Sequence, residues 1–257
     1  MTTLLTVDIG NTSISLGVFA GTKVVRTAMV ETTLPFSARR KKLSAAVRAL
    51  KKNSRAWDGA VICSVVPKAT AEVCAVVRKE TGVKAVVIGK DIIVPVVNRY
   101  RNPRQVGQDR LVCAYAAMEL YGAPAVVIDF GTAITFDVVS RRKEYLGGLI
   151  VPGIRLSAES LFQKTALLPR VEIMKPGALI GRDTVESILS GLFHGYGAMS
   201  RGLIHLIAKH VGGRPKVIVT GGYTELIEKF IAKDIRAIDR HLVFKGMKLL
   251  WERHNAV

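Results

Sequence analysis

The sequence contains only three cysteines, Cys63, Cys74 and Cys113, and none of them forms a CxxC pair. Their odd number and wide spacing argue against a disulfide framework, and the five histidines do not supply the close ligand spacing of a zinc site. We therefore expect three small, buried cysteines in a reducing compartment.

Long apolar runs are also missing. The most apolar helical stretch, residues 187–200, has 14 residues, whereas a membrane span needs about 20. The N-terminus leads directly into an apolar strand, without the basic segment and cleavage site of a signal peptide. These absences predict a cytoplasmic protein with no membrane partner.

Acidic residues are scarce, since 20 Asp and Glu face 38 Lys and Arg, giving a net charge of +18. The densest basic cluster covers residues 39–55, but Leu43, Ala46, Val47 and Leu50 recur within it at helical spacing. This pattern indicates the solvated face of an amphipathic helix. No aromatic residues interleave with the basic ones, so we expect anionic small molecules rather than nucleic acid as partners.

Neither of the two common phosphate-binding motifs, GxxxxGK[ST] and GxGxxG, occurs in the chain. Strand-like and helix-like segments nevertheless alternate along all 257 residues, which is typical of an α/β protein. The patterns predict strands over 3–8, 13–20, 23–30, 60–66, 84–88, 125–130, 133–140, 144–151 and 216–220, and helices over 37–52, 68–81, 105–121, 155–163, 183–210, 223–233 and 241–253.

One segment is repeated: TVDIGNTSISLGV (6–18) returns as VIDFGTAITFDVV (127–139) when one gap follows the glycine. Both copies end an apolar strand with Asp-x-Gly and a Thr, and a second strand follows. The repeat predicts a duplicated domain, with residues 1–115 and 116–257 as the two halves. The C-terminal helix is a candidate to pack back on the first half. Asp8 and Asp129 are expected to face each other across the cleft between the halves.

A single Asp-x-Gly turn is often no more than a hairpin turn. Two such turns favour a phosphate site, because a glycine turn lets backbone N–H groups approach phosphate oxygens and a Thr or Asn adds a donor. The carboxylates would need Mg²⁺ or a cation-bound water between themselves and phosphate. The pair of turns therefore predicts a nucleotide clamp.

Five segments carry a family resemblance: YRNPRQVGQDRLVCAYAA (100–117), DFGTAITFDVV (129–139), YLGGLIVPGIRLSAESLFQKTALLPRVE (145–172), IGRDTVESILSGLFHGYGA (180–198) and TGGY (220–223). Together they resemble the type III pantothenate kinases of the acetate and sugar kinase/actin-like superfamily. The resemblance implies duplicated actin-like (ribonuclease H-like) domains, with mixed sheets flanked by helices and an ATP cleft between them. It also implies ATP-dependent conversion of pantothenate to 4'-phosphopantothenate, the first step of coenzyme A biosynthesis.

On the nucleotide side, the resemblance implies that the first turn and Thr132 bind ATP. The residues of the first turn are Asp8, Ile9, Gly10, Asn11, Thr12, Ser13, Ile14 and Ser15. Asp129 corresponds to a ligand of a monovalent cation, K⁺ or NH₄⁺, and Asp8 is a candidate to hold Mg²⁺ through water. Gly221 and Gly222 match the stretch near adenosine, although a plain strand-to-helix turn is the alternative.

On the acceptor side, Gly107-Gln108-Asp109-Arg110 matches a family motif usually written Gly-Ala-Asp-Arg, with Gln in place of Ala. The resemblance makes Asp109 the general base for the primary hydroxyl of pantothenate, and makes Tyr100 and Arg110 substrate ligands. By the residues alone, Asp109 and Arg110 would more often be a helix cap and a surface charge.

The resemblance also implies a homodimer in which Thr184 contacts pantothenate bound to the neighbouring subunit. By itself Thr184 is a residue near a helix N-terminus. The following helix carries a face of small residues, Gly191, Gly195, Ala198 and Gly202, which suits close helix packing between subunits or within the core.

Two other functions stay open at this point. One is a non-catalytic regulatory accessory protein with the same fold, which only the basic charge favours. The other is a kinase of a different small hydroxyl substrate.

Overall fold

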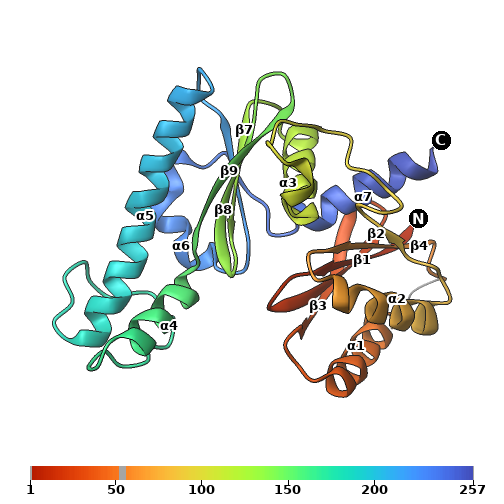
Figure 1. Ribbon diagram of the computed structural model, residues 1–257, viewed down its shortest axis with the longest axis horizontal. Coiled ribbons are helices and arrows are strands. Elements are labelled where there is room, and N and C mark those ends of the chain that lie inside the picture. The colour runs from red at the N-terminus through yellow and green to blue at the C-terminus, as the bar shows by residue number, and fades with distance from the viewer. Residues whose placement is uncertain (1, 52–55, 257) are drawn as a thin grey trace. The chain divides into compact units, whose positions relative to one another are not determined.

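The computed structural model describes residues 2–51 and 56–256, so Lys52 and Arg55 of the basic cluster lie outside the described residues. The chain divides into two compact units (Figure 1). Unit 1 contains Met1–Val96, Arg101–Ala116 and His241–Val257, and unit 2 contains Val97–Tyr100 and Ala117–Arg240.

Unit 1 contains a five-stranded sheet of order β3-β2-β1-β4-β5. The strands β1 to β3 form an antiparallel meander, whereas β4 and β5 continue the sheet in parallel from β1. The elements are β1 (Thr3–Ile9), β2 (Ser13–Ala20), β3 (Lys23–Glu31), α1 (Phe36–Lys51), β4 (Gly59–Ser64), α2 (Pro67–Thr81), β5 (Val86–Val87), the 3-10 turn η1 (Pro103–Gln105), the start of α3 (Gln108–Leu120) and α7 (Leu242–Asn255).

Unit 2 repeats this plan in a six-stranded sheet of order β11-β10-β7-β8-β9-β6. Again three strands, β7 to β9, form the meander, and β10 and β11 extend it in parallel from β7. The elements are β6 (Val97–Asn98), β7 (Ala125–Phe130), β8 (Ala133–Val139), β9 (Glu144–Pro152), α4 (Ile154–Lys164), α5 (Thr184–His210), β10 (Lys216–Thr220), α6 (Thr224–Ile231), η2 (Ala232–Asp234) and β11 (Ala237–Ile238).

The predicted α/β class with two mixed sheets is confirmed, and the shared order of five strands agrees with the duplication inferred from the sequence repeat. Helix and strand positions follow the hydrophobic patterns closely. Three short elements, β6, η1 and β11, have no counterpart among the predicted segments. They are two or three residues long, which is too short for a periodic pattern.

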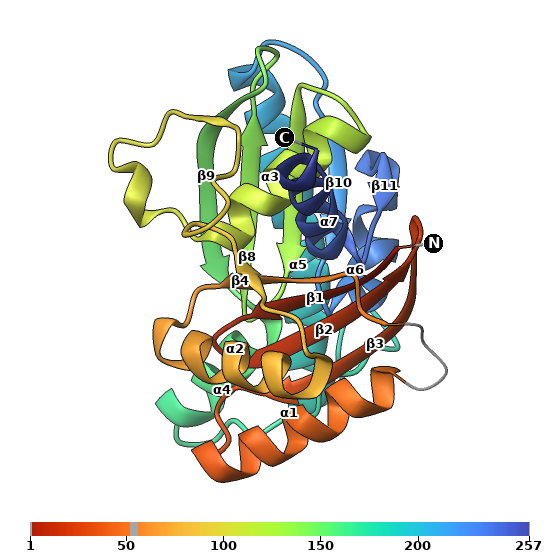
Figure 2. The same cartoon turned by 90° about the vertical axis from the view of Figure 1, so that its right-hand side faces the viewer.

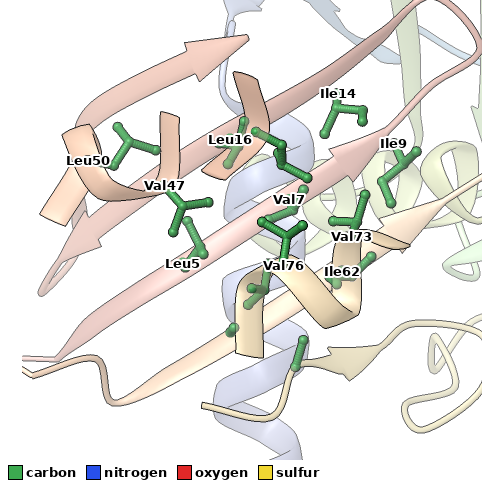
Figure 3. Packing of buried hydrophobic residues seen from close by; sticks show 14 of the residues in the cluster. Leu5, Val7, Ile9, Ile14, Leu16, Val47, Leu50, Ile62, Val73 and Val76 are labelled. Carbon is green, nitrogen blue, oxygen red and sulfur yellow. The ribbon is translucent and has the colours of Figure 1, made fainter. Parts of the chain in front are cut away.

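Strand alternation gives the first sheet one face that packs on α1 and α2. Leu5, Val7 and Ile9 of β1 point into this core, where they meet Val47 of α1 and Val73 of α2 (Figure 3). The other face of β1 and β4 is covered by α7, as the side view shows (Figure 2). A Cβ atom on Gly17 or Gly59 would lie 2.7 Å from the rings of Phe244 or Trp251, so α7 sits directly on the strand backbones.

None of the three cysteines forms a disulfide; Cys63 and Cys113 are buried as expected, whereas Cys74, on α2, is only partly buried. No helix in the described part of the chain is both long and apolar enough to span a bilayer.

Candidate active site

The first Asp-x-Gly turn joins β1 to β2. The Gly10 N–H donates to the Ser13 carbonyl at 2.9 Å, which closes the hairpin and leaves Asn11 and Thr12 exposed at its tip. The side chains of Ile9 and Ile14 are fully buried in the core of unit 1. Only the backbone of these two residues is therefore suited to meet a ligand at the turn.

Thr32, the residue that follows β3, is hydrogen-bonded to the backbone of this turn. Its hydroxyl donates to the Gly10 carbonyl at 2.8 Å and its N–H donates to the Thr12 carbonyl at 2.9 Å. The residue is 7% exposed. No motif marks Thr32 in the sequence, because its role depends on a strand pairing across some twenty residues of chain.

Asp8 lies on the face of the sheet opposite the α1 and α2 core. Its cross-strand neighbours are Ser15 on β2 and Cys63 on β4, so the three side chains form one row. Burial raises the pKa of the Cys63 thiol, and the charges of Asp8 and Asp109 raise it further. A Cβ on Gly107 would lie 3.3 Å from a side-chain carbon of Val65, whose N–H donates to the Ile9 carbonyl at 3.0 Å, so the 107–110 motif begins beside the end of β1.

The 107–110 motif forms the start of α3. A Cβ on Gly107 would lie 2.4 Å from Oδ1 of Asp109, so only glycine leaves room for this carboxylate. The same oxygen accepts a hydrogen bond from the Arg110 N–H at 2.8 Å. Gln108, where the family motif has Ala, packs its side chain against Gly89, whose φ is +85°. The substitution therefore has a packing partner and leaves Asp109 in place.

Asp109 is partly buried. Burial raises the pKa of its carboxyl, and this effect outweighs the opposing hydrogen bond and charge of Arg110. A raised pKa makes a carboxylate a stronger base than an exposed aspartate.

The second turn, in unit 2, joins β7 to β8 around Gly131 and the exposed Thr132. The Gly131 N–H donates to the Ala133 carbonyl at 3.2 Å, which parallels the first turn. Gly153 packs against the turn from β9, because a Cβ there would lie 2.3 Å from the Thr132 carbonyl oxygen.

The Asp129 carboxylate lies between two glycines. A Cβ on Gly221 would come within 2.3 Å of its Oδ1, and one on Gly131 within 3.4 Å. Gly221 also has a φ of +100°, and Tyr223 donates from its N–H to the Phe130 carbonyl at 3.1 Å. The TGGY stretch is therefore a turn built around Asp129, whereas Gly222 has open space around it.

Tyr100 and Thr184 also belong to unit 2. The Tyr100 ring lies against Gly147, where an added Cβ would be 3.2 Å from a ring carbon. Thr184 is the exposed first residue of α5, and the N-cap is its neighbour Asp183, whose side chain accepts from the Glu186 N–H at 2.8 Å. The structure groups Asp8, Asp109 and Arg110 in unit 1, and Tyr100, Asp129, Thr132 and Thr184 in unit 2. The facing of Asp8 and Asp129 stays a prediction.

Among the described residues, no three His, Cys, Asp or Glu side chains are clustered as ligands of one metal ion. The polar groups at the two turns are carboxylate, hydroxyl, amide and backbone groups, which suit hard cations that keep water or phosphate as further ligands.

Residues 4–206 match the family model of type III pantothenate kinase. The type III pantothenate kinase of Brevibacillus brevis is 37% identical over 98% of this chain and 100% of its own length. That of Persephonella marina is 39% identical over 98% of this chain and 99% of its own. The chain belongs to the type III pantothenate kinase family.

The fold has solved counterparts. A ROK family glucokinase from Streptomyces griseus, determined with glucose and AMPPNP, covers 97% of this chain with a TM-score of 0.58 and 14% identity. At this identity the likeness shows the shared fold alone, and it supports the actin-like class inferred from the family resemblance.

The clearance at Gly221 makes a direct prediction. In Gly221→Ala the methyl group would overlap Asp129 and the backbone would be strained at a φ of +100°, so we expect the free energy of unfolding to fall by about 1–3 kcal/mol. Urea unfolding measures this change. Gly222→Ala is the matched control and should differ from wild type by less than about 0.5 kcal/mol. Equal losses in both variants would contradict the close packing of Asp129 on Gly221.

The raised pKa of Asp109 predicts how stability depends on pH. Between the unperturbed value of 3.8 and the raised value, the folded state binds more protons than the unfolded state. As pH rises through this interval, the free energy of unfolding of the wild type therefore falls relative to that of Asp109→Asn. Above the interval, the difference between the two proteins stays constant. Urea unfolding of both proteins from pH 3 upward tests this. If the wild type instead became more stable relative to Asp109→Asn as pH rises, the Asp109 pKa would be lowered in the folded protein.

Proposed function

We propose that this protein phosphorylates the primary hydroxyl of pantothenate with ATP, yielding 4'-phosphopantothenate in the first step of coenzyme A biosynthesis. The observation that carries the proposal is the 107–110 motif at the start of α3. There Gly107 makes room for Asp109, burial raises the pKa of its carboxyl, and Gly107 lies against Val65 beside the end of β1. Family membership over nearly the whole chain supports the same reaction.

On the nucleotide side, we assign ATP binding to residues 8–15 and to Thr132. The exposed tip of each turn offers backbone N–H and hydroxyl donors to phosphate oxygens. In each turn the glycine N–H donates to the carbonyl of the first residue of the next strand, Ser13 or Ala133, which supports a shared role in holding phosphates.

On the acceptor side, Asp109 orients the pantothenate hydroxyl and accepts its proton as the oxygen attacks the γ-phosphate in line. Its raised pKa favours this role over that of a surface aspartate. Arg110 pairs with the pantothenate carboxylate, to which a guanidinium can donate two hydrogen bonds. Tyr100, Gly107 and Gln108 complete the substrate contacts, with Thr184 added from a neighbouring subunit.

We assign a monovalent cation, K⁺ or NH₄⁺, to Asp129 and water-bridged Mg²⁺ to Asp8. The fit rests on the donor types, because carboxylate and hydroxyl oxygens are the ligands that such hard cations prefer. When bound, such ions neutralise charge on phosphate oxygens. The protein's own part is positioning, which Gly221, Gly153 and Thr32 support by fixing the turns.

We also infer a homodimer formed through α5. Gly191, Gly195, Ala198 and Gly202 are exposed along one face, and the three glycines have open space around them. Leu179, Ile180 and Leu206 are large, exposed apolar side chains of the same unit. A hollow of about 300 Å³ lies between residues 179–181 and α5. A cytoplasmic location is part of the proposal and is supported by three cysteines that form no disulfide.

The catalytic assignment is tested with Asp109→Asn in a coupled assay that follows ADP formation on addition of pantothenate. We expect kcat to fall by about 10²–10⁴-fold, since a positioned base contributes that much. Affinity for a non-hydrolysable ATP analogue should change little. A variant that keeps more than about a tenth of the wild-type rate would remove Asp109 from the base role.

Wild-type turnover should rise when K⁺ replaces Na⁺, and equal rates in both salts would count against the cation at Asp129.

The dimer is tested by placing a bulky side chain on the open face of α5. Gly195→Trp should prevent close helix approach and halve the mass measured by sedimentation equilibrium. Ala45→Trp, on the exposed face of α1 in unit 1, is the control and should leave the mass unchanged. A wild-type protein that sediments as a monomer would overturn the dimer.

A further inference from the structure

A largely buried ion pair joins the two helices beneath the first sheet. Arg39 of α1 approaches Oε2 of Glu72 on α2 with Nη2 at 2.5 Å and Nε at 3.1 Å. Their side chains are 16% and 5% exposed. Because two charges are costly to remove from water, such a pair adds little net stability by itself. Its role is therefore inferred from its other contacts.

The guanidinium of Arg39 has a second set of partners on the segment between β3 and α1. Its Nη1 donates to the Thr32 carbonyl at 2.8 Å and to the Leu34 carbonyl at 3.0 Å. A charged donor makes these hydrogen bonds stronger than neutral ones. Glu72, by holding the other edge of the guanidinium, fixes the direction in which Nη1 points.

Thr32 connects Arg39 to the first turn, because its hydroxyl and N–H donate to the carbonyls of Gly10 and Thr12. The position of Thr32 therefore fixes the orientation of these two carbonyls. In a planar trans peptide the carbonyl and the following N–H point in opposite directions. The only cis peptide among the described residues is Ala123-Pro124. The N–H groups of Asn11 and Ser13 are therefore directed away from Thr32.

We propose that Arg39 and Glu72 are positioning residues for the nucleotide: through Thr32, they fix the orientation of backbone N–H groups that receive ATP phosphates. The inference rests on the proposed function, because it takes the first turn to be a phosphate site. It assigns a role in ATP affinity to two side chains on the α1 and α2 layer, outside the sequence motifs.

The chain provides a matched control in Arg48, which also bridges α1 and α2. Its Nη1 lies 3.4 Å from Oε1 of Glu80, which is 7% exposed. Arg48 lies further along α1, toward the end of the helix remote from Thr32. Arg39→Met and Arg48→Met each remove one inter-helix ion pair, but only Arg39→Met releases the Thr32 carbonyl.

The readout is the affinity for a non-hydrolysable ATP analogue, measured by titration calorimetry, together with the KM values for ATP and pantothenate. We expect Arg39→Met to weaken nucleotide affinity by about tenfold, the factor for one net hydrogen bond. The pantothenate KM should stay within about twofold, because the change acts on the nucleotide turn alone. Arg48→Met should leave both values unchanged, although both variants lower the melting temperature.

Arg39→Met alone leaves Glu72 buried without its counter-ion, which can destabilise the fold. A double variant separates this effect from the loss of positioning. Arg39→Met with Glu72→Met removes both charges and should show the same loss of nucleotide affinity. Thr32→Val, which deletes the hydrogen bond to Gly10, should lower the affinity as well.

Equal nucleotide affinity in the wild type, the double variant and Arg48→Met would overturn the inference. A wild-type protein that binds the analogue without phosphorylating pantothenate would overturn the proposed function instead. The affinity comparison still decides the role of Arg39 and Glu72 in that case.

Discussion

The alternation of side chains along a β-strand is the constraint on which the candidate site depends. In β1, Leu5, Val7 and Ile9 are committed to the core with α1 and α2, so Asp8 is directed to the opposite face. In β7, Ile128 and Phe130 are committed in the same way, and Asp129 takes the corresponding position. A one-residue slip in either strand would move the carboxylate into the apolar core on the opposite face. The apolar residues of β1 and β7 thus determine the face of the sheet on which Asp8 and Asp129 lie.

Close approach of backbone to side chain is the second recurring feature. Gly107 lies against Asp109, Gly221 against Asp129 and Gly153 against the Thr132 carbonyl. At each position a single added carbon would overlap a group that the proposed reaction uses. These glycines place functional groups by leaving room for them, in contrast to Thr32, which places the first turn by hydrogen bonds.

The sequence was sufficient for the parts of this account that depend on local pattern. The repeat of Asp-x-Gly and Thr predicts both turns, and strand and helix periodicity predicts the two mixed sheets. It could not predict Thr32 or the pairing of Arg39 with Glu72, because these contacts join residues from different elements. Gln108 departs from the family motif, and its packing against Gly89 also joins residues that are distant in the sequence. The place of Gly107 against Val65, just after β4, likewise needs the sheet register and the start of α3 together.

Transfer of the γ-phosphate of ATP to pantothenate is tested most directly by identifying the product. The protein is incubated with ATP, Mg²⁺ and K⁺, pantothenate, glucose and acetate are offered separately, and the products are identified by mass spectrometry. We expect 4'-phosphopantothenate, formed one for one with ADP, and no phosphorylated glucose or acetate. ADP formation that does not depend on pantothenate, or phosphorylation of another acceptor in its place, would contradict it.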